Sequence, residues 1–409
     1  PIPNSSLPAT FRLPDGRSAP MSCPACGAGG ARVVYAVERI PVHSNVLLAT
    51  REAALAYARG DLELAHCARC GFLFNSLFDP ARADYGTGYE ETQGFSATFR
   101  RWLGELAARL ASRYALSGGR LLEIGCGKGE FLLELCARAV ARGLGFDPTL
   151  DLARTRPPPQ VELLPRRYGA GDHDLAVDLV CCRHTLEHIP DVASFVRMLR
   201  SNLGERAIPV FFEVPDTLRE LEEGAFWDIY YEHCSYFTPG SLARLFRTAR
   251  FEIEELELAY GAQYVLLFAR AGTGQATPRL ALEDDLTRIA GAVARFRDSV
   301  RQSLRHWHGF LQAARARSES VVLWGSGSKG VGFLCTLAGE SLVRYVVDVN
   351  PHKHGRFMPG SGHEIVPPDY LRTFRPAHVI VMNPVYREEI AADLARMGVT
   401  TKLHALPDQ

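Results

Sequence analysis

The stretch "LLEIGCGKGEF", Leu121 to Phe131, joins a short apolar run to an apolar helix pattern through three glycines in alternating positions. A run of this length is typical of a buried strand, and the glycines form a turn that lets the backbone approach a ligand closely. A strand, a glycine-rich turn and a helix in this order form the first unit of a nucleotide-binding α/β sheet. The stretch therefore predicts a mostly parallel sheet with a ligand at the carboxyl end of its first strand.

The segments that follow continue this alternation of strand and helix. Three further strands are expected in "ARGLGFDP" (141–148), "DLVCCRHTL" (178–186) and "PVFFEVPD" (209–216). A second glycine-rich unit, "VVLWGSGSKGVGFL" (321–334), follows a charged segment that is expected to form one or two connecting helices (279–318). The fold class is therefore α/β, with an N-terminal domain over residues 1–82, a second domain over 83–276, and connecting helices with a third, Rossmann-like domain over 277–409.

Composition and charge argue against several classes of function. The 409 residues include 46 Lys and Arg against 46 Asp and Glu, with 47% hydrophobic and 22% charged residues. This balance is typical of a soluble globular protein, and without a basic excess we expect neither nucleic acid nor membrane as a partner. No apolar run is long enough to span a bilayer and no export signal is recognisable. We therefore expect a cytoplasmic protein, monomeric or homodimeric, that acts on a small molecule.

Two cysteine pairs near the N-terminus predict a metal site. Cys23 and Cys26 lie in "CPAC", Cys67 and Cys70 lie in "CARC", and each pair is followed by a glycine. Two such knuckles supply four thiolates, the ligand set of a closed tetrahedral Zn²⁺ site, and a closed site has a structural role. The alternative is a pair of redox dithiols or free thiols.

Two carboxylates accompany the first glycine-rich turn. Glu123 lies two residues before the first glycine, and Asp147 ends the next strand, where a carboxylate can bind both hydroxyls of a ribose. The third strand ends in "CCRHTLEHIPD" (181–191). The pattern E-x-G-x-G-x-G, then Asp, then "LEHIPD" resembles class I S-adenosylmethionine methyltransferases. This resemblance implies S-adenosylmethionine as the cofactor, bound by Glu123, Gly125, Gly127, Gly129, Asp147 and His184.

The stretch "YYEHCSYFTPGSL" (230–242) follows the fourth strand, at the edge where open α/β sheets hold their ligands. Methyl transfer to carbon requires a base that removes a proton beside a carbonyl, and the imidazole of His233 titrates near neutrality. Glu232 is expected to orient this imidazole or to polarise the substrate, and Tyr230 and Tyr236 to supply hydroxyl donors to an enolate. The alternative is a loop histidine beside core aromatic rings.

The whole chain resembles the sugar C-methyltransferases, which methylate nucleotide-linked keto-deoxysugars in natural product pathways. The resemblance is carried by the four cysteines, the methyltransferase motifs, Tyr-x-Glu-His-x-x-Tyr-Phe (230–237) and "VVDVNPHKHGRFMPG" (346–360). It implies a zinc domain, a middle S-adenosylmethionine domain and a C-terminal Rossmann-like domain, with His233 as the base. The chain departs from the family in three segments that we expect near the substrate (41–47, 260–268 and 381–386).

The second glycine-rich turn, "GSGSKG" (325–330), fits two ligands. With Asp348 at the end of the next strand, its spacing is that of a dinucleotide fingerprint, which would indicate an NAD-dependent oxidoreductase. Lys329 beside a helix N-terminus favours instead the pyrophosphate of a nucleotide-linked substrate. We expect substrate contacts from Tyr89, Tyr236, Ser328, Lys329 and Asn383. Two alternatives stay open: methyl transfer to oxygen or nitrogen, and a zinc-stapled binding module without catalysis.

Overall fold

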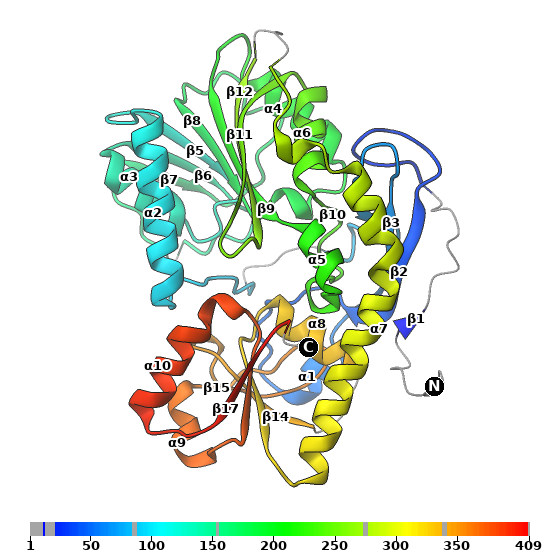
Figure 1. Cartoon of the computed structure of the whole chain (residues 1–409). Coiled ribbons are helices and arrows are strands. Elements are labelled where there is room, and N and C mark those ends of the chain that lie inside the picture. The colour runs from blue at the N-terminus through cyan, green and yellow to red at the C-terminus, as the bar shows by residue number, and fades with distance from the viewer. Residues whose placement is uncertain are drawn as a thin grey trace.

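The computed structural model describes residues 11–12, 21–83, 88–152, 155–272, 277–337 and 342–407. Within these residues the chain forms three β-sheets. Figure 1 shows two layered α/β units, one above the other, with the long helix α7 (Leu286–Ala316) running beside both. The α/β class expected from the alternating strand and helix patterns is confirmed.

The first sheet joins the cysteine pairs to a segment from much later in the chain. Its antiparallel strands follow the order β1 (Phe11–Arg12), β2 (Arg32–Pro41), β3 (Arg59–His66), β4 (Leu73–Asn75) and β10 (Ser235–Tyr236). The short helix α1 (Arg51–Leu55) lies between β2 and β3 and begins at Thr50, whose side chain accepts from the N–H of Ala53. Because β10 belongs to the "YYEHCSYF" stretch and pairs with β4, the first sheet extends beyond the boundary expected at residue 82.

The second sheet carries the first glycine-rich turn. Its order is β11 (Phe251–Ala259), β12 (Tyr264–Ala271), β9 (Pro209–Pro215), β8 (Leu179–Arg183), β5 (Arg120–Ile124), β6 (Arg142–Phe146) and β7 (Val161–Leu164). The strands from β9 to β7 are parallel, and β12 is antiparallel to both of its neighbours. The chain order reverses between β5 and β8, and open α/β sheets bind their ligands at the carboxyl ends of strands at such a reversal.

Helices cover both faces of the second sheet because its inner strands are apolar on both sides. Leu121 of β5 packs with α2 (Ala97–Arg113) and α3 (Glu130–Ala139), while its neighbour Leu122 packs with α4 (Val192–Asn202) and α6 (Pro239–Thr248). Strand β8 is buried along its whole length, as expected for a parallel strand between two helical layers. Helix α5 (Thr217–Glu223) follows β9 and packs against α7.

The third sheet is parallel throughout and carries the second glycine-rich turn. Its order is β15 (Ile365–Val366), β14 (Val343–Val347), β13 (Val321–Trp324), β16 (His378–Val381) and β17 (Lys402–Ala405), with the helices α8 (Ser328–Leu337), α9 (Leu371–Phe374) and α10 (Arg387–Met397). Short 3₁₀ helices complete the connections: η2 (Leu186–His188), η3 (Phe226–Asp228), η4 (Ala281–Glu283), η5 (Pro351–Lys353), η6 (Pro368–Tyr370) and η7 (Pro384–Tyr386).

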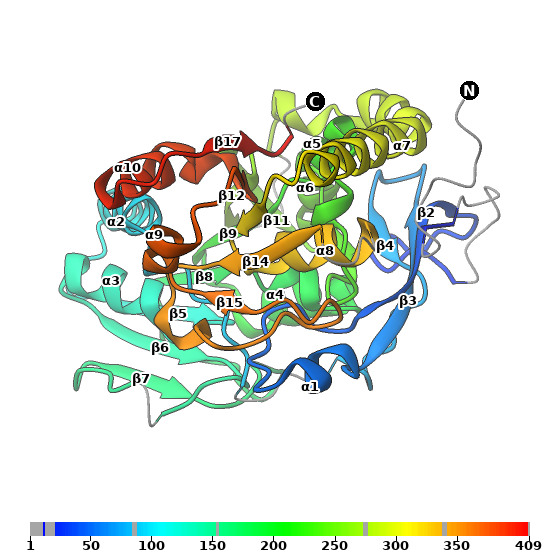
Figure 2. The same cartoon turned by 90° about the horizontal axis from the view of Figure 1, so that it is seen from below.

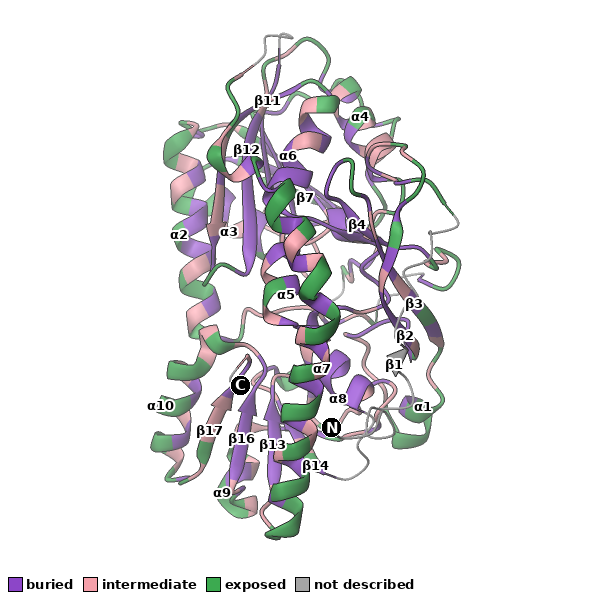
Figure 3. Cartoon of the chain, turned by 45° about the vertical axis from the view of Figure 1, so that its right-hand side comes forward, coloured by how far each residue is buried: buried purple, intermediate pink, exposed green. Residues whose placement is uncertain are grey.

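Helix α7 ties the three sheets together. The expected connecting helices are one continuous helix of 31 residues after η4. Its buried stripe, which includes Ile289, Phe296 and Trp307, packs with residues of β2, α5 and α8, and Figure 3 shows its opposite side exposed. This one-sided burial is the amphipathic pattern of a surface helix. A search of the described residues for a helix with the length and apolarity needed to cross a membrane finds none.

The third sheet is anchored to the other two by polar contacts. Glu389 of α10 caps the N-terminus of α2, accepting hydrogen bonds from Ser96 Oγ at 2.7 Å and from the N–H of Thr98 at 3.0 Å. Seen from below in Figure 2, the chain after β14 approaches α1, where the N–H of Gly360 donates to the carbonyl of Ala54 at 2.8 Å. These anchors fix the two glycine-rich turns on opposite sides of one cavity.

Candidate active site

The four predicted zinc ligands meet in one cluster. The Sγ atoms of Cys23 and Cys70 are 3.7 Å apart, as are those of Cys26 and Cys67, and all four lie within 4.8 Å of one another. A tetrahedron with metal–sulfur bonds of about 2.3 Å has sulfur–sulfur edges of about 3.8 Å. The residues therefore fit a Zn²⁺ ion in both chemistry and spacing.

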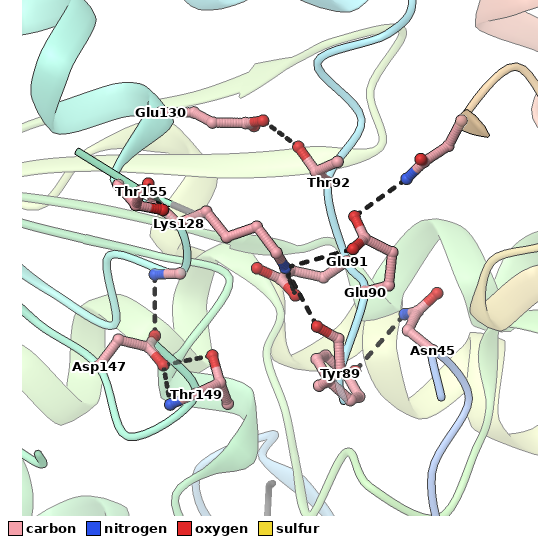
Figure 4. A network of polar contacts seen from close by, with 12 residues as sticks. Asn45, Tyr89, Glu90, Glu91, Thr92, Lys128, Glu130, Asp147, Thr149 and Thr155 are labelled. Carbon is pink, nitrogen blue, oxygen red and sulfur yellow. Dashed lines mark hydrogen bonds and ion pairs between the residues drawn. The ribbon is translucent and has the colours of Figure 1, made fainter. Parts of the chain in front are cut away.

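The first glycine-rich turn has no room for side chains at two of its glycines. A Cβ atom at Gly125 would lie 1.9 Å from Thr185 Oγ1, and one at Gly127 would lie 2.8 Å from Glu91 Oε1; both glycines also have positive φ. Asp147 closes the turn, because its Oδ2 accepts from the N–H of Gly127 at 2.8 Å and its Oδ1 accepts from Thr149 Oγ1 at 2.6 Å (Figure 4). Asp147, the residue predicted to bind the ribose, is thus held rigidly beside the turn.

Glu123 lies behind this turn and lines the same cavity. It is 2% exposed, and its Oε2 has no hydrogen-bond partner within the described part of the chain. Burial raises the pKa of Glu123 to about 8, against the opposing charge of Arg183. Arg183 donates from Nε to Glu213 Oε2 at 2.6 Å, and its Nη2 also lacks a partner among the described residues. Buried polar atoms without partners mark a place that a bound ligand satisfies, and the turn, Asp147 and Glu123 together fit S-adenosylmethionine.

His184 follows β8 directly, has a positive φ and lines the cavity. Its Nε2 lies 3.2 Å from Glu213 Oε1 and its Nδ1 lies 3.6 Å from Glu187 Oε1. Burial lowers the pKa of His184, but the Glu213 and Glu187 carboxylates outweigh it and raise that pKa to about 9. The imidazole is therefore protonated at neutral pH and adds a positive charge to the wall behind the first turn.

A cavity of about 650 Å³ connects the two glycine-rich turns. The first turn, the stretch 230–238 and the second turn all contribute to its lining, among them Gly125, Gly127, Asp147, Tyr230, His233, Gly325, Ser328 and Lys329. The three segments in which the chain departs from its family also line it, through Asn45, Gln263, Tyr264, Met382, Asn383 and Tyr386. Motifs from all three predicted domains therefore share one site.

His233 lies in the wall of this cavity between aromatic rings. Its ring centroid is 4.3 Å from that of Tyr230 and 4.7 Å from that of His188. The side chain is 5% exposed, and its ring has no hydrogen-bond partner in the described ranges. Burial lowers the pKa of His233 well below its usual value, and His188, His184 and Lys329 lower it further. The imidazole is therefore neutral at physiological pH and can accept a proton.

Glu232 does not orient His233. Its Oε2 accepts from the Tyr89 hydroxyl at 2.8 Å and its Oε1 accepts from the N–H of Ser44 at 3.0 Å, both on the side of the first sheet. Tyr236 also departs from expectation: its hydroxyl donates to the carbonyl of Tyr230 at 3.0 Å, and its side chain does not contribute to the described lining of the cavity. Because β10 places successive side chains on opposite faces, Tyr236 is drawn into the core of the first sheet.

The second glycine-rich turn is shaped like the first. Asp348 Oδ2 accepts from the N–H of Ser326 at 2.9 Å, so this carboxylate closes its turn as Asp147 closes the other. Lys329 reaches the cavity wall, but its ammonium is paired with Asp228 of η3. Ser328 Oγ contacts Asn45 Nδ2 at 3.2 Å, and Asn383 Oδ1 accepts from Gln263 Nε2 at 2.7 Å. The predicted substrate residues Ser328 and Asn383 thus lie where the third sheet meets the other two.

Residues that the sequence did not single out also line the cavity. Glu220 of α5 is 2% exposed, its Oε2 has no partner among the described residues, and burial raises its pKa well above the usual value. In the sequence, "TLRELEE" looks like a solvated helix, so nothing pointed to Glu220.

Glu187, His188 and His233 bring one ligand atom each within 4.8 Å of one another. The "LEHIPD" motif was a visible signal for Glu187 and His188.

Comparisons with known proteins agree with this geometry. A family model described as "Methyltransferase domain" matches residues 96–256, and one described as "C-methyltransferase C-terminal domain" matches residues 279–402. C-methyltransferase NovU of Streptomyces niveus is 26% identical over 389 residues, which cover 90% of each chain. A ubiquinone biosynthesis O-methyltransferase of Thiobacillus denitrificans is 29% identical over 36% of this chain and 69% of its own. The solved structure of an O-methyltransferase family protein from Burkholderia thailandensis aligns with 43% of this chain and 57% of its own, at 13% identity and a TM-score of 0.36.

The second sheet, the turn closed by Asp147 and the matched methyltransferase domain define an S-adenosylmethionine-dependent methyltransferase of class I. With the matched C-terminal domain and a C-methyltransferase that aligns over nearly the whole chain, the protein combines the two domains of an S-adenosylmethionine-dependent C-methyltransferase.

Proposed function

We propose that the protein methylates a carbon beside a ketone, in a nucleotide-linked deoxysugar, with His233 as the base that forms an enolate. The observation that carries this proposal is the imidazole of His233. It is buried and neutral, has no hydrogen-bond partner in the described chain, and faces the cavity that both glycine-rich turns line. A neutral imidazole offers a nitrogen lone pair that can accept a proton; its lowered pKa makes it a weaker base than an exposed histidine, so its position in the cavity wall carries the assignment.

S-adenosylmethionine, when bound, supplies an electrophilic methyl group on a sulfonium. The residues of the chain remove the proton and stabilise the charge that forms. His233 removes the proton from the carbon beside the ketone, and the electron pair of that C–H bond becomes an enolate. Tyr230, whose ring packs on His233 and lines the cavity, is the hydroxyl donor that we assign to the enolate oxygen. The contacts of Glu232 with Tyr89 and Ser44 hold the catalytic stretch in place, so Glu232 is a positioning residue.

The second glycine-rich turn supports a nucleotide-linked acceptor. Helix α8 begins at Ser328, and its N-terminus lies at the cavity, where backbone N–H groups favour a phosphate. Lys353 lies at the same wall with its Nζ 3.4 Å from Asn45 Oδ1. We assign the pyrophosphate to this turn and to Lys353 rather than to Lys329, whose ammonium is paired with Asp228. The four-cysteine cluster is assigned a structural zinc ion, since four thiolates leave no open coordination position.

The base step is tested without methyl transfer. Enzyme, S-adenosylhomocysteine and a nucleoside diphosphate keto-deoxyhexose are mixed in deuterated water, and exchange at the carbon beside the ketone is followed by NMR. General base catalysis typically contributes about 10²- to 10⁴-fold, so His233→Ala should lower exchange by at least that factor. His173→Ala, on an exposed loop of the same domain, is the matched control.

Three outcomes would contradict the proposal. Exchange at the wild-type rate in His233→Ala would place the base elsewhere. Activity that requires an added divalent cation after brief chelation would assign Glu187, His188 and His233 to a metal site instead. A product whose carbon spectrum has the new methyl on oxygen or nitrogen would make the enzyme an O- or N-methyltransferase.

A further inference from the structure

A segment outside the methyltransferase motifs crosses the first glycine-rich turn. Residues 88–93, which we call the strap, pair on one side with the segment that follows β2: the N–H of Glu90 donates to the carbonyl of Asn45 at 2.6 Å. On the other side the strap meets the turn through Lys128, whose Nζ donates to the carbonyl of Tyr89 at 3.1 Å and to Glu91 Oε2 at 2.9 Å. Figure 4 shows Lys128 reaching across to the strap from the turn.

Glu91 lies against the backbone of that turn. Its Oε1 occupies the position 2.8 Å from where a Cβ of Gly127 would be, and both Glu91 and Lys128 line the cavity. Gly127 is also the residue whose N–H donates to Asp147. The carboxylate of Glu91 and the ammonium of Lys128 therefore lie at the donor site, on the strap side of the turn.

Most other carboxylates near the turn are engaged or neutral. Asp147 accepts hydrogen bonds from Gly127 and Thr149, and Glu130 accepts from the hydroxyl of Thr92. Burial raises the pKa of Glu123 to about 8, which keeps that group protonated at neutral pH. Burial also raises the pKa of Glu91, but there the ammonium of Lys128 opposes the shift. Glu90 approaches Lys128 only to 3.9 Å, against 2.9 Å for Glu91, so Glu91 is the carboxylate whose partner a zwitterionic ligand can replace.

The donor brings such a zwitterion. Its amino-acid end carries one ammonium and one carboxylate, opposite in sign to Glu91 and Lys128 respectively. We propose that Glu91 binds the α-ammonium of S-adenosylmethionine and that Lys128 binds its α-carboxylate, so that the donor inserts into the Glu91–Lys128 ion pair. Two charge-assisted pairs then replace one, and the strap is held to the turn through the donor itself.

The test compares two ligands that differ only in the proposed contact. S-adenosylhomocysteine has the amino-acid end, whereas 5′-methylthioadenosine lacks it and keeps the adenosine and the sulfur. Calorimetric titration of the zinc-loaded full chain should show Glu91→Gln binding S-adenosylhomocysteine about 10- to 100-fold more weakly, the range of one charge-assisted hydrogen bond. The affinity for 5′-methylthioadenosine should change by less than about twofold, because the variant leaves the adenosine contacts intact.

Glu134→Gln, whose carboxylate is paired with Arg138 on α3, is the control for loss of one carboxylate from the same unit, and both affinities should stay at the wild-type value. Lys128→Met should repeat the pattern of Glu91→Gln. Equal losses for the two ligands would show that Glu91 only shapes the turn, and an unchanged affinity for S-adenosylhomocysteine would remove Glu91 from the donor site; either result overturns the proposal. Neither ligand involves the acceptor, so failure of the acceptor assignment would leave this test unaffected.

Discussion

In the absence of ligand, the Glu123→Gln variant should be more stable than the wild type, and this difference in stability should grow as the pH rises. The pKa of Glu123 is about 8 in the fold, against 4.5 for an ordinary glutamate. Below pH 4.5 both the folded and the unfolded chain carry the proton. Between pH 4.5 and 8 the unfolded carboxyl ionises while the folded one stays protonated, so wild-type stability falls with rising pH in that window.

The magnitude follows from the pKa difference. One pKa unit corresponds to about 1.4 kcal/mol, so holding Glu123 neutral at pH 7 costs about 3 kcal/mol. Gln has nearly the same shape and does not ionise, so the variant lacks this penalty. From pH 6 to pH 8 the stability difference should grow by about 2 kcal/mol, since the folded carboxyl itself begins to ionise near pH 8, which corresponds to roughly 4–8 °C in Tm for a domain of this size.

Differential scanning calorimetry of both proteins at several pH values and constant ionic strength measures this growth. The slope with pH is the quantity of interest, because the exchange of a hydroxyl for an amide adds a constant offset. Glu134→Gln again serves as the control. A difference between variant and wild type that stays constant from pH 6 to pH 8 would refute the reasoning. It would mean that Arg183 keeps Glu123 ionised in the fold.

Three further predictions concern other parts of the molecule. Pure protein should contain one equivalent of zinc by metal analysis, and Cys67→Ser should lose it together with thermal stability; less than about half an equivalent in the wild type would count against a zinc site. Asp147→Ala should weaken S-adenosylhomocysteine binding about tenfold or more by calorimetry, and an unchanged affinity would exclude Asp147 from the ribose site. Glu389→Ala removes the carboxylate that accepts from Ser96 and Thr98 at the start of α2, and at about 1 kcal/mol should lower Tm by roughly 2–4 °C, whereas an unchanged Tm would show that these contacts are dispensable.

The parts of the site that the sequence predicted are those set by local patterns. The strand before Gly125 is a continuous apolar run, and the turn follows because only glycine fits beside Thr185. Each cysteine knuckle is likewise a local turn, whereas the pairing of β2 with β3 brings the two knuckles together. A strand, a turn and a knuckle depend on neighbours within a few residues, so a single sequence contains them.

The parts that the sequence did not predict depend on distant partners. Glu232 was expected beside the adjacent His233, but its contacts are Ser44 and Tyr89, far away along the chain. Tyr236 was expected in the cavity, but its pairing in β10 with Leu73 of β4 draws it into a core. Glu91 has no motif at all, and its place beside Gly127 arises only when the strap crosses the turn. Tertiary packing decides each of these positions.

The pairing of β10 with β4 limits how this enzyme can be recombined with a relative. In a chimaera joined at residue 82, β10 would have to pair with a strand from the other protein. His233 lies only two residues before β10, so its position depends on this pairing. Exchange of acceptor preference between two such enzymes therefore requires residues 21–83 and 230–238 to be transferred together. The smallest unit that can be transferred is therefore the first sheet, whose strands come from two segments that are far apart in the sequence.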